Sequence, residues 1–265
     1  MKKIIIFLFL FVTLNNTYAF DYLFTRYNSA ESLGNGANNI AFANSLSKII
    51  YNPAGLVYIA EPQTLFSLST INNKNFLFNI AYGQPISEYT PLSIAINGSY
   101  YFSSPITLYN FGTGIGMQFN IIKIGLYSSF FFSPDDTQSK HFKSKLGVLL
   151  TPAFFNLGST IQHIYENHES KFKWDIQLGL KIIPNLELSY GLHKDIITKT
   201  SFFQNFGVNY KFTDFLKLGS NYDFNEEKFS FGTYLSSYVL SLNLATIYNF
   251  SLKTWDYAIC FQYNF

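Results

Sequence analysis

The feature that most constrains the fold of this chain is an alternation of apolar and polar residues that recurs from Thr64 to the C-terminus. From Phe172 to Ile182, large apolar residues alternate with Lys, Asp, Gln and Gly. Leu92 to Phe102 and Trp255 to Phe265 repeat the pattern. Because successive side chains of a β-strand point to opposite faces, each segment predicts a strand with one apolar face and one polar or small face.

Counting these segments gives fourteen predicted strands. An even number is expected for a single-chain antiparallel barrel whose two ends lie on the same side of a membrane. The sequence therefore predicts an all-β fold, a 14-stranded antiparallel transmembrane β-barrel over residues 63–265. The predicted strands are 63–71, 76–83, 91–102, 107–119, 122–132, 144–151, 154–164, 172–182, 186–193, 201–212, 215–224, 229–235, 238–248 and 255–265.

The connections between these strands alternate in length. Asn120-Ile121 is a tight turn, whereas the connections over 133–143 and 165–171 are longer and more polar. Short periplasmic turns alternating with longer outer loops are typical of outer-membrane barrels, although the stretch 84–91 is long where a short turn is expected. A soluble β-sandwich also alternates, but its strands do not need so wide an apolar face, and the barrel is favoured.

The N-terminal residues predict export. Lys2 and Lys3 precede an uncharged apolar stretch, Ile4 to Leu14, and Ala19 stands at a suitable cleavage position. Eleven apolar residues are too few to span a bilayer, which needs about 20. We therefore predict a signal peptide over 1–19, with a short membrane anchor as the alternative. An exported apolar chain without a spanning helix is expected in the bacterial outer membrane, in contact with outer-membrane lipid.

Composition excludes several classes of function. The 18 basic and 16 acidic residues leave a net charge of +2, which gives no electrostatic case for nucleic acid. Cys260 is the only cysteine, and no metal or cofactor motif is present. His141 and His168 are expected in outer loops near acidic residues, but no motif fixes a nucleophile beside a base. We expect no enzyme activity, no metal and no cofactor.

Glycine provides a check on the strand phase, because it was not used to set that phase. Only Gly98 falls on the apolar face of a predicted strand. A lumen wall rich in glycine leaves room for something packed inside, or it helps to coil the sheet. Twelve glycines fall on the polar face: Gly83, Gly112, Gly114, Gly116, Gly125, Gly147, Gly158, Gly179, Gly191, Gly207, Gly219 and Gly232.

Residues 20–62 do not follow the strand pattern and form the predicted N-terminal hatch. They contain a possible short helix over 38–49 and end in an aromatic-Asn-Pro-Ala-Gly-Leu box. In this box, proline fixes φ and Gly55 permits a tight turn. The region resembles the FadL-like superfamily of outer-membrane proteins, which includes the PorV and PorQ proteins. The matching hatch residues are Leu33, Gly34, Gly36, Ala37, Ala41, Ala43, Tyr51, Asn52, Pro53, Ala54, Gly55 and Leu56.

The resemblance implies a fourteen-stranded barrel with a hatch in its lumen and, as function, uptake of small hydrophobic compounds. The alternative it leaves open is a PorV/PorQ-like component that assists protein secretion or surface attachment, with secretion-system proteins as partners. The sequence departs from the family pattern at Asn44, where an acidic residue is usual, which puts a charged hatch contact in doubt. Its outer loops are also shorter than those that build a capture groove in FadL.

The C-terminal residues Phe261, Tyr263 and Phe265 alternate along the last predicted strand. They resemble the terminal signal that the barrel-insertion machinery recognises, which makes that machinery an expected partner. Outward aromatic residues are also expected here as part of an interfacial girdle.

Overall fold

The computed structural model describes residues 29–34, 39–71, 74–86, 91–103, 106–134, 141–152, 154–166, 169–195 and 203–265. The predicted signal peptide lies outside these ranges and stays a prediction. Within the described part of the chain, no helix is long and apolar enough to cross a membrane.

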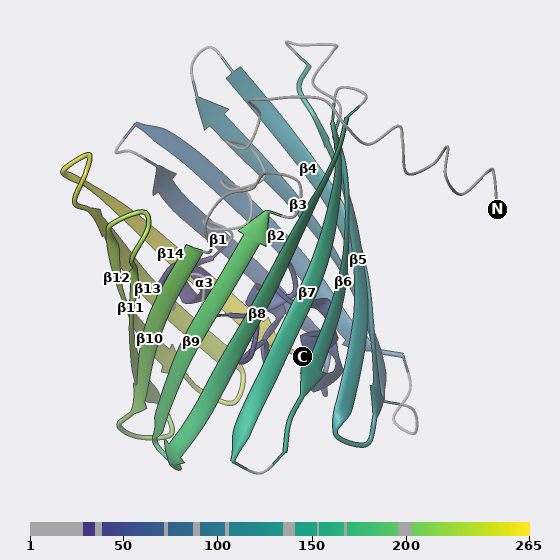
Figure 1. Ribbon diagram of the computed structural model, residues 1–265, viewed down its shortest axis with the longest axis vertical. Helices are drawn as coiled ribbons and strands as arrows, with labels where there is room; N and C mark the ends of the chain where they lie inside the picture. Colours follow the sequence, from purple (N-terminus) through teal and green to yellow (C-terminus); the bar gives the residue numbers. More distant parts are fainter. Residues whose placement is uncertain are drawn as a thin grey trace.

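Fourteen antiparallel strands form a closed barrel among the described residues, which confirms the predicted fold class (Figure 1). Each strand pairs with its neighbours in sequence, and the first closes on the last through Gln63↔Asn264 to Ser69↔Ala258. The strands are β1 (Gln63–Ile71), β2 (Asn75–Pro85), β3 (Leu92–Ser103), β4 (Ile106–Phe119), β5 (Ile122–Phe132), β6 (His141–Leu150), β7 (Phe155–Glu166), β8 (Glu169–Ile183), β9 (Leu186–Asp195), β10 (Phe203–Lys211), β11 (Leu216–Asp223), β12 (Lys228–Ser236), β13 (Leu240–Asn249) and β14 (Thr254–Asn264).

The side chains also face outward and inward as the alternation predicted. Along β3, Ile96 is 58% exposed on the outer face, whereas its neighbour Ala95 is buried on the inner face. Leu126 and Tyr257 are likewise exposed on the outside of β5 and β14. A closed sheet has no free edge and can place this apolar belt against lipid, so the soluble sandwich alternative is wrong.

Several predicted connections are shorter than the sequence suggested. The loop expected over 165–171 is mostly strand, because β7 and β8 remain paired up to Glu166↔Glu169. Likewise His141, expected in a loop, is the first residue of β6, and its side chain is buried on the inner face of the barrel. In both hairpins the alternation of inner and outer side chains continues, with Lys143 and Lys171 buried on the inner face, so pairing extends past the predicted strand ends. Lys145 lies in the middle of β6.

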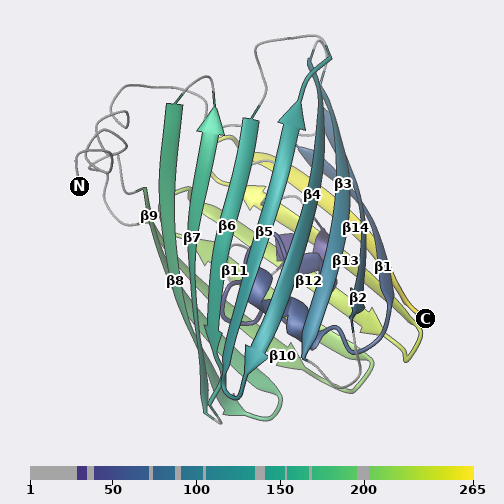
Figure 2. The same cartoon turned by 90° about the vertical axis from the view of Figure 1, so that its right-hand side faces the viewer.

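Residues 29–34 and 39–62, called the inner segment from here on, run inside the barrel (Figure 2). The segment contains α3 (Ala30–Gly34), η1 (Leu46–Lys48) and η2 (Pro53–Tyr58). The short helix predicted over 38–49 is wrong, since only the single turn of η1 forms there. One reason is that the backbone N–H of Ala41 donates to Gln177 of the wall, instead of to a helical carbonyl.

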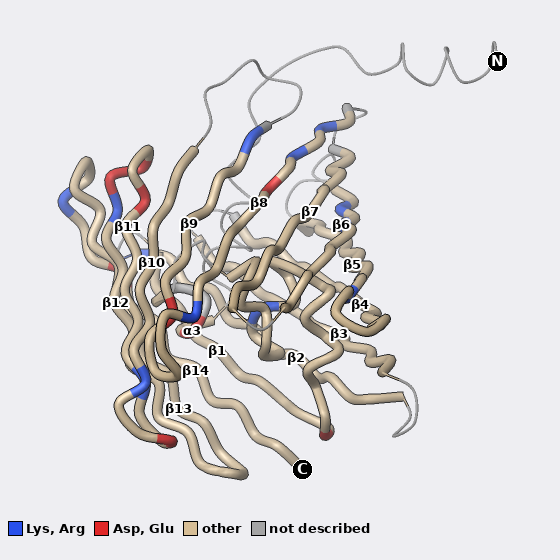
Figure 3. The backbone as a smooth tube through the Cα atoms, turned by 60° about the horizontal axis from the view of Figure 1, so that its bottom comes forward, with Lys and Arg blue, Asp and Glu red and all other residues tan. Residues whose placement is uncertain are grey.

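The core of the molecule lies between the inner segment and the barrel wall. Leu46, Ile50 and Leu56 of the inner segment join inward-facing residues such as Leu65 and Tyr127 in one buried apolar cluster. Charged positions gather toward the strand ends, with a small group inside the barrel near α3 (Figure 3). The inner segment therefore packs against the inner face of the wall at these contacts.

Candidate functional site

The Asn-Pro-Ala-Gly-Leu box forms η2 and attaches it to the wall. Asn52 caps η2, because its Oδ1 accepts from the Ala54 N–H at 3.1 Å. The other side of the same amide donates from Nδ2 to the Ile40 carbonyl at 3.0 Å and to the Val148 carbonyl of β6 at 3.2 Å. Pro53 suits the first helical position, where no backbone donor is needed. One asparagine thus joins two parts of the inner segment to the barrel.

Gly55 is required for a different reason from the one predicted. Its backbone does not adopt a positive φ, so conformational freedom is not what selects glycine here. Instead, a Cβ at this position would lie 1.9 Å from the carbonyl oxygen of Ala43. The two arms of the inner segment therefore cross at Gly55 with their backbones in direct contact.

Inward-facing glycines make room for the inner segment along one side of the wall. A Cβ on Gly125 would lie 2.2 Å from the Pro53 carbonyl carbon, and one on Gly147 would lie 2.1 Å from Asn52 Oδ1. Such distances are too short for any real side chain, so glycine sets the fit. The glycine cradle, as we name this group, consists of Gly83, Gly114, Gly116, Gly125, Gly147, Gly158 and Gly179.

Two polar side chains of the cradle wall bind the backbone of the inner segment. Lys145 Nζ donates to the Ile50 carbonyl at 2.8 Å, and Gln177 Oε1 accepts from the Ala41 N–H at 2.6 Å. Both wall side chains are buried. A buried backbone polar group without a partner is costly, so these residues stabilise a segment that has little regular structure of its own.

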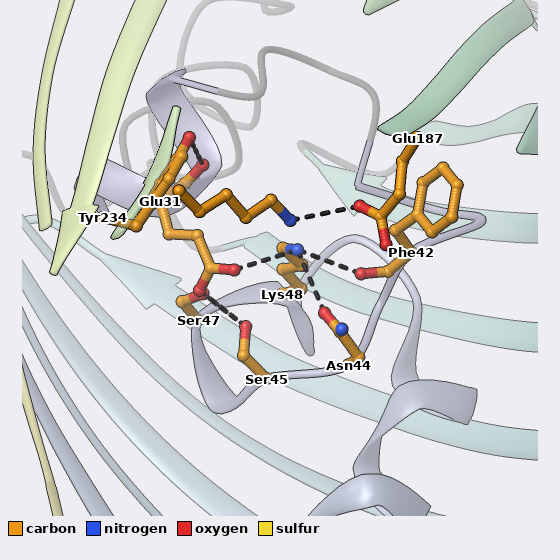
Figure 4. Close-up of polar contacts among 9 residues, drawn as sticks. Glu31, Phe42, Asn44, Ser45, Ser47, Lys48, Glu187 and Tyr234 are labelled. Carbon is orange, nitrogen blue, oxygen red and sulfur yellow. Dashed lines mark hydrogen bonds and ion pairs between the residues drawn. The ribbon is translucent and has the colours of Figure 1, made fainter. Parts of the chain in front are cut away.

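The other side of the inner segment is held by a buried ion pair, shown in Figure 4. Lys48 Nζ lies 2.9 Å from Glu31 Oε1, and it also donates to the carbonyl of Phe42 and to Asn44 Oδ1. Glu31 Oε2 accepts from the hydroxyls of Ser45 and Ser47, at 2.7 and 2.5 Å. The carboxylate thus joins α3 to the segment around η1.

The electrostatics of this cluster keep Glu31 ionised. Burial alone would raise the pKa of the carboxyl, but the charge of Lys48, the Ser47 hydrogen bond and the charge of Lys217 together lower the pKa to about 2. Lys217 on β11 is itself paired with Glu187 on β9 at 3.1 Å. Two ion pairs therefore lie close together, one within the inner segment and one in the wall (Figure 4).

The hydrogen bonds between α3 and β12 are long. Tyr234 of β12 donates to the Glu31 carbonyl at 3.4 Å, and Ser230 donates to the Gly34 carbonyl at 3.5 Å. Gly34 and Gly232 meet closely, since a Cβ on Gly34 would lie 2.6 Å from the Gly232 Cα. α3 is thus seated on β12 by one close glycine contact and two long hydrogen bonds, and its Ala30 packs in the buried cluster with Ala245 and Ala258.

The predicted hatch residues fall partly within this site. Residues 51–56 all lie in the inner segment and are buried there. Gly36 and Ala37 lie outside the described residues, as does the side chain of Leu33. Asn44 contributes a neutral acceptor where the family pattern has an acid, and Glu31 supplies the charge instead. The charged contact in this part of the inner segment is therefore made by Glu31 and Lys48, and not by residue 44.

Sequence reasoning missed the wall residues Lys145 and Gln177 and the pair Glu31–Lys48. One signal was available, because Lys48 is the only basic residue between Arg26 and Lys74. A lone lysine within an apolar and small-residue stretch indicates a buried cation with a partner.

The histidines do not form a hydrolytic site among the described residues. His163 faces the outer, membrane side of β7, where it stacks on Phe172 and lies 3.1 Å from Ser170 Oγ. His193 stacks on Phe203, and His168 lies outside the described ranges. The described residues also contain no group of three His, Cys, Asp or Glu side chains placed to hold a metal ion.

The C-terminal aromatic residues lie on the outer face of β14. Phe261, Tyr263 and Phe265 are all exposed, and the Phe265 N–H donates to the Pro62 carbonyl at 2.9 Å. The last residue therefore meets the start of the first strand. Their role as an assembly signal stays a prediction.

The closed barrel with an apolar outer belt defines the class: the chain is a transmembrane β-barrel of the bacterial outer membrane. No protein-family model and no curated protein sequence matches it.

Solved structures resemble the chain in fold. The Ralstonia pickettii toluene transporter TbuX matches with a TM-score of 0.69 at 8% identity, covering 91% of this chain and 99% of that one. A deltaS2 mutant of the TodX monoaromatic hydrocarbon channel gives 0.67 at 9% identity, with the same coverage. The Acinetobacter baumannii outer membrane protein Omp33 gives 0.55 at 9% identity, covering 78% of this chain and 98% of that one. Such low identities establish the shared barrel fold alone.

Proposed function

We propose that this barrel admits small hydrophobic compounds across the outer membrane through a lumen that the inner segment keeps closed to ions. The observation that carries the proposal is the fit of residues 39–62 against the glycine cradle. Fourteen strands enclose a lumen wider than the eight-stranded barrels that side chains just fill, so an added segment is needed to close it. Glycine at the wall lets that segment pack closely.

The chemistry of the closed lumen supports an apolar cargo. Leu46, Ile50 and Leu56 place aliphatic side chains among inward-facing residues of the wall. The charges near them are paired within the protein, as at Glu31–Lys48. Two barrels that share the fold are the toluene transporter TbuX and the monoaromatic hydrocarbon channel TodX. A toluene-like compound is therefore the natural first probe.

The test is the initial rate of radiolabelled toluene uptake by cells that lack the gene, complemented with the wild-type protein or with an empty vector. We expect the wild-type protein to raise toluene uptake and to leave the uptake of a polar solute of similar size unchanged. Equal toluene uptake with and without a folded barrel contradicts the proposal. A matched rise for the polar solute indicates an open pore instead.

A second candidate is a component that assists protein secretion or surface attachment. It is favoured by the short outer connections, such as the two residues between β7 and β8 and the two between β3 and β4. Such connections leave little material for a capture groove outside the membrane. Loss of surface proteins from a gene-deletion strain whose toluene uptake is normal supports this second candidate.

A further inference from the structure

A groove of about 510 Å³ lies in the outer surface of the barrel, where β12, β13, β14 and β1 run side by side. Leu68, Leu244 and Tyr257 are among the exposed outward side chains that line it. This volume is in the range of sites that hold small organic ligands, about 300–1,000 Å³. The lining residues are Leu68, Thr70, Phe231, Thr233, Leu244, Ala245, Thr246, Tyr257, Ala258 and Ile259.

The groove coincides with the place where β1 leaves β14. Backbone pairing between these strands ends at Ser69↔Ala258, whereas β14 stays paired with β13 up to Thr254. Beyond that point, Thr70 Oγ1 accepts from the Tyr257 N–H at 2.8 Å. A side-chain hydroxyl thus replaces the backbone partner, as is required where a ladder ends within a membrane.

The wall behind the groove is thin and is covered from inside by α3. The inward-facing residues of this patch include Gly232, Ala245 and Ala258, all small. Ala30 of α3 belongs to the same buried cluster as Ala245 and Ala258. One layer of sheet with small inner side chains therefore separates the groove from α3.

We propose that this groove is a specific binding site for one acyl chain of an outer-membrane lipid. The groove opens onto the apolar outer belt, so its occupant comes from the hydrocarbon layer that surrounds the barrel. Its mouth is lined by aliphatic and aromatic side chains, and the Thr70 hydroxyl is already bonded to the backbone of Tyr257. An acyl chain is apolar, flexible and present at high concentration at this depth.

Native mass spectrometry after detergent extraction and delipidation tests the proposal, because it counts the lipids that remain on each barrel. We expect the wild-type protein to retain one lipid. Thr233→Trp fills the groove and should lower retention about tenfold or more. Thr113→Trp is the matched control, since Thr113 also faces outward on β4 but does not line the groove. Heat-modifiable gel migration shows that each variant is folded.

If Thr233→Trp does not fold, Thr246→Trp on the neighbouring strand is used to fill the groove instead. The proposal is overturned if the wild-type protein retains no lipid, or if the groove variants and Thr113→Trp retain lipid equally. It is also overturned if the wild-type protein is a dimer that Thr233→Trp converts to a monomer, since the occupant is then a second copy of the chain.

Discussion

The two sides of the inner segment are held in different ways. Residues 39–58 fit against β2 to β8 by shape, with the backbone around Pro53 in direct contact with Gly125 and Gly116. α3 lies against β12 to β14, where its hydrogen bonds to Tyr234 and Ser230 are 3.4 and 3.5 Å long.

This difference suggests that residues 39–58 stay fixed to the wall, whereas α3 can be released from it. A close-packed backbone contact is lost only if the wall or the segment moves, because interiors pack densely and leave no slack. An ion pair such as Glu31–Lys48 can be broken by one substitution or by one proton. We therefore expect the glycine cradle to determine whether the segment is seated, and the ion pair to determine how firmly α3 is held.

The largest effect is expected from Gly125→Leu. Its side chain would occupy the space of the Pro53 backbone, so either the barrel fails to assemble or the segment is expelled. Gly98→Leu is the matched control, because Gly98 faces outward and its nearest contacts for a Cβ are 3.7 Å away. Heat-modifiable gel migration shows whether each variant barrel is folded. Limited proteolysis shows whether its inner segment is protected. Equal behaviour of the two would show that the cradle does not set the fit.

Glu31→Gln should have the next largest effect. It leaves Lys48 buried without its counter-charge, which costs about 3–5 kcal/mol for a buried pair. We expect protease to cut within the inner segment much faster, while the barrel itself stays folded. The double variant Glu31→Gln/Lys48→Met removes both charges and should recover most of the protection. A double variant as labile as the single one would mean that the charges are not coupled.

Acid should release α3 by the same route. The pKa of Glu31 is lowered from its ordinary value of 4.5 to about 2, so its contribution to stability is fully present above pH 4.5. As the pH falls from 4.5 towards about 2, the released state takes up a proton on Glu31 that the seated state does not, so this contribution is lost progressively. Proteolysis by an acid-active protease across this range should show the loss in the wild-type protein. The Glu31→Gln variant should show no such step.

The smallest effect is expected from Asn44→Asp, which restores the acid of the family pattern. Asn44 is exposed and accepts from Lys48 at 3.1 Å, so a carboxylate there adds a partly screened attraction. Its gain is about 0.2–1 kcal/mol. A slightly higher protease resistance of the inner segment is the expected result. A marked loss of resistance would mean that Lys48 is already fully neutralised by Glu31.

The barrel could be predicted from the sequence because its signal is local and repeated. Each strand such as β3 carries its own alternation, and the phase of one strand does not depend on distant residues. Hairpin ends were less predictable: the 165–171 stretch lacks an apolar face to mark it, although its strands pair up to Glu166 and Glu169.

The contacts of the inner segment could not be predicted from local sequence patterns. Gln177 binds Ala41 across 136 positions, and Glu31 meets Lys48 through a segment with no repeating pattern. The twelve polar-face glycines predicted only that something could lie inside. Which residues lie there depends on the tertiary fold, since backbone carbonyls such as those of Ile50 and Pro53 carry no sequence signature.

Single-channel conductance in planar bilayers tests the central claim, that the inner segment closes the lumen, most directly. The wild-type protein is compared with a variant that lacks residues 24–56, after both are shown to be folded by heat-modifiable migration. The glycines of the cradle leave space at the lumen-facing wall of this fourteen-stranded barrel, and the inner segment occupies that space. We therefore predict that the wild-type barrel is nearly silent and that the deletion variant conducts steadily. Equal conductance of the two barrels would contradict the account.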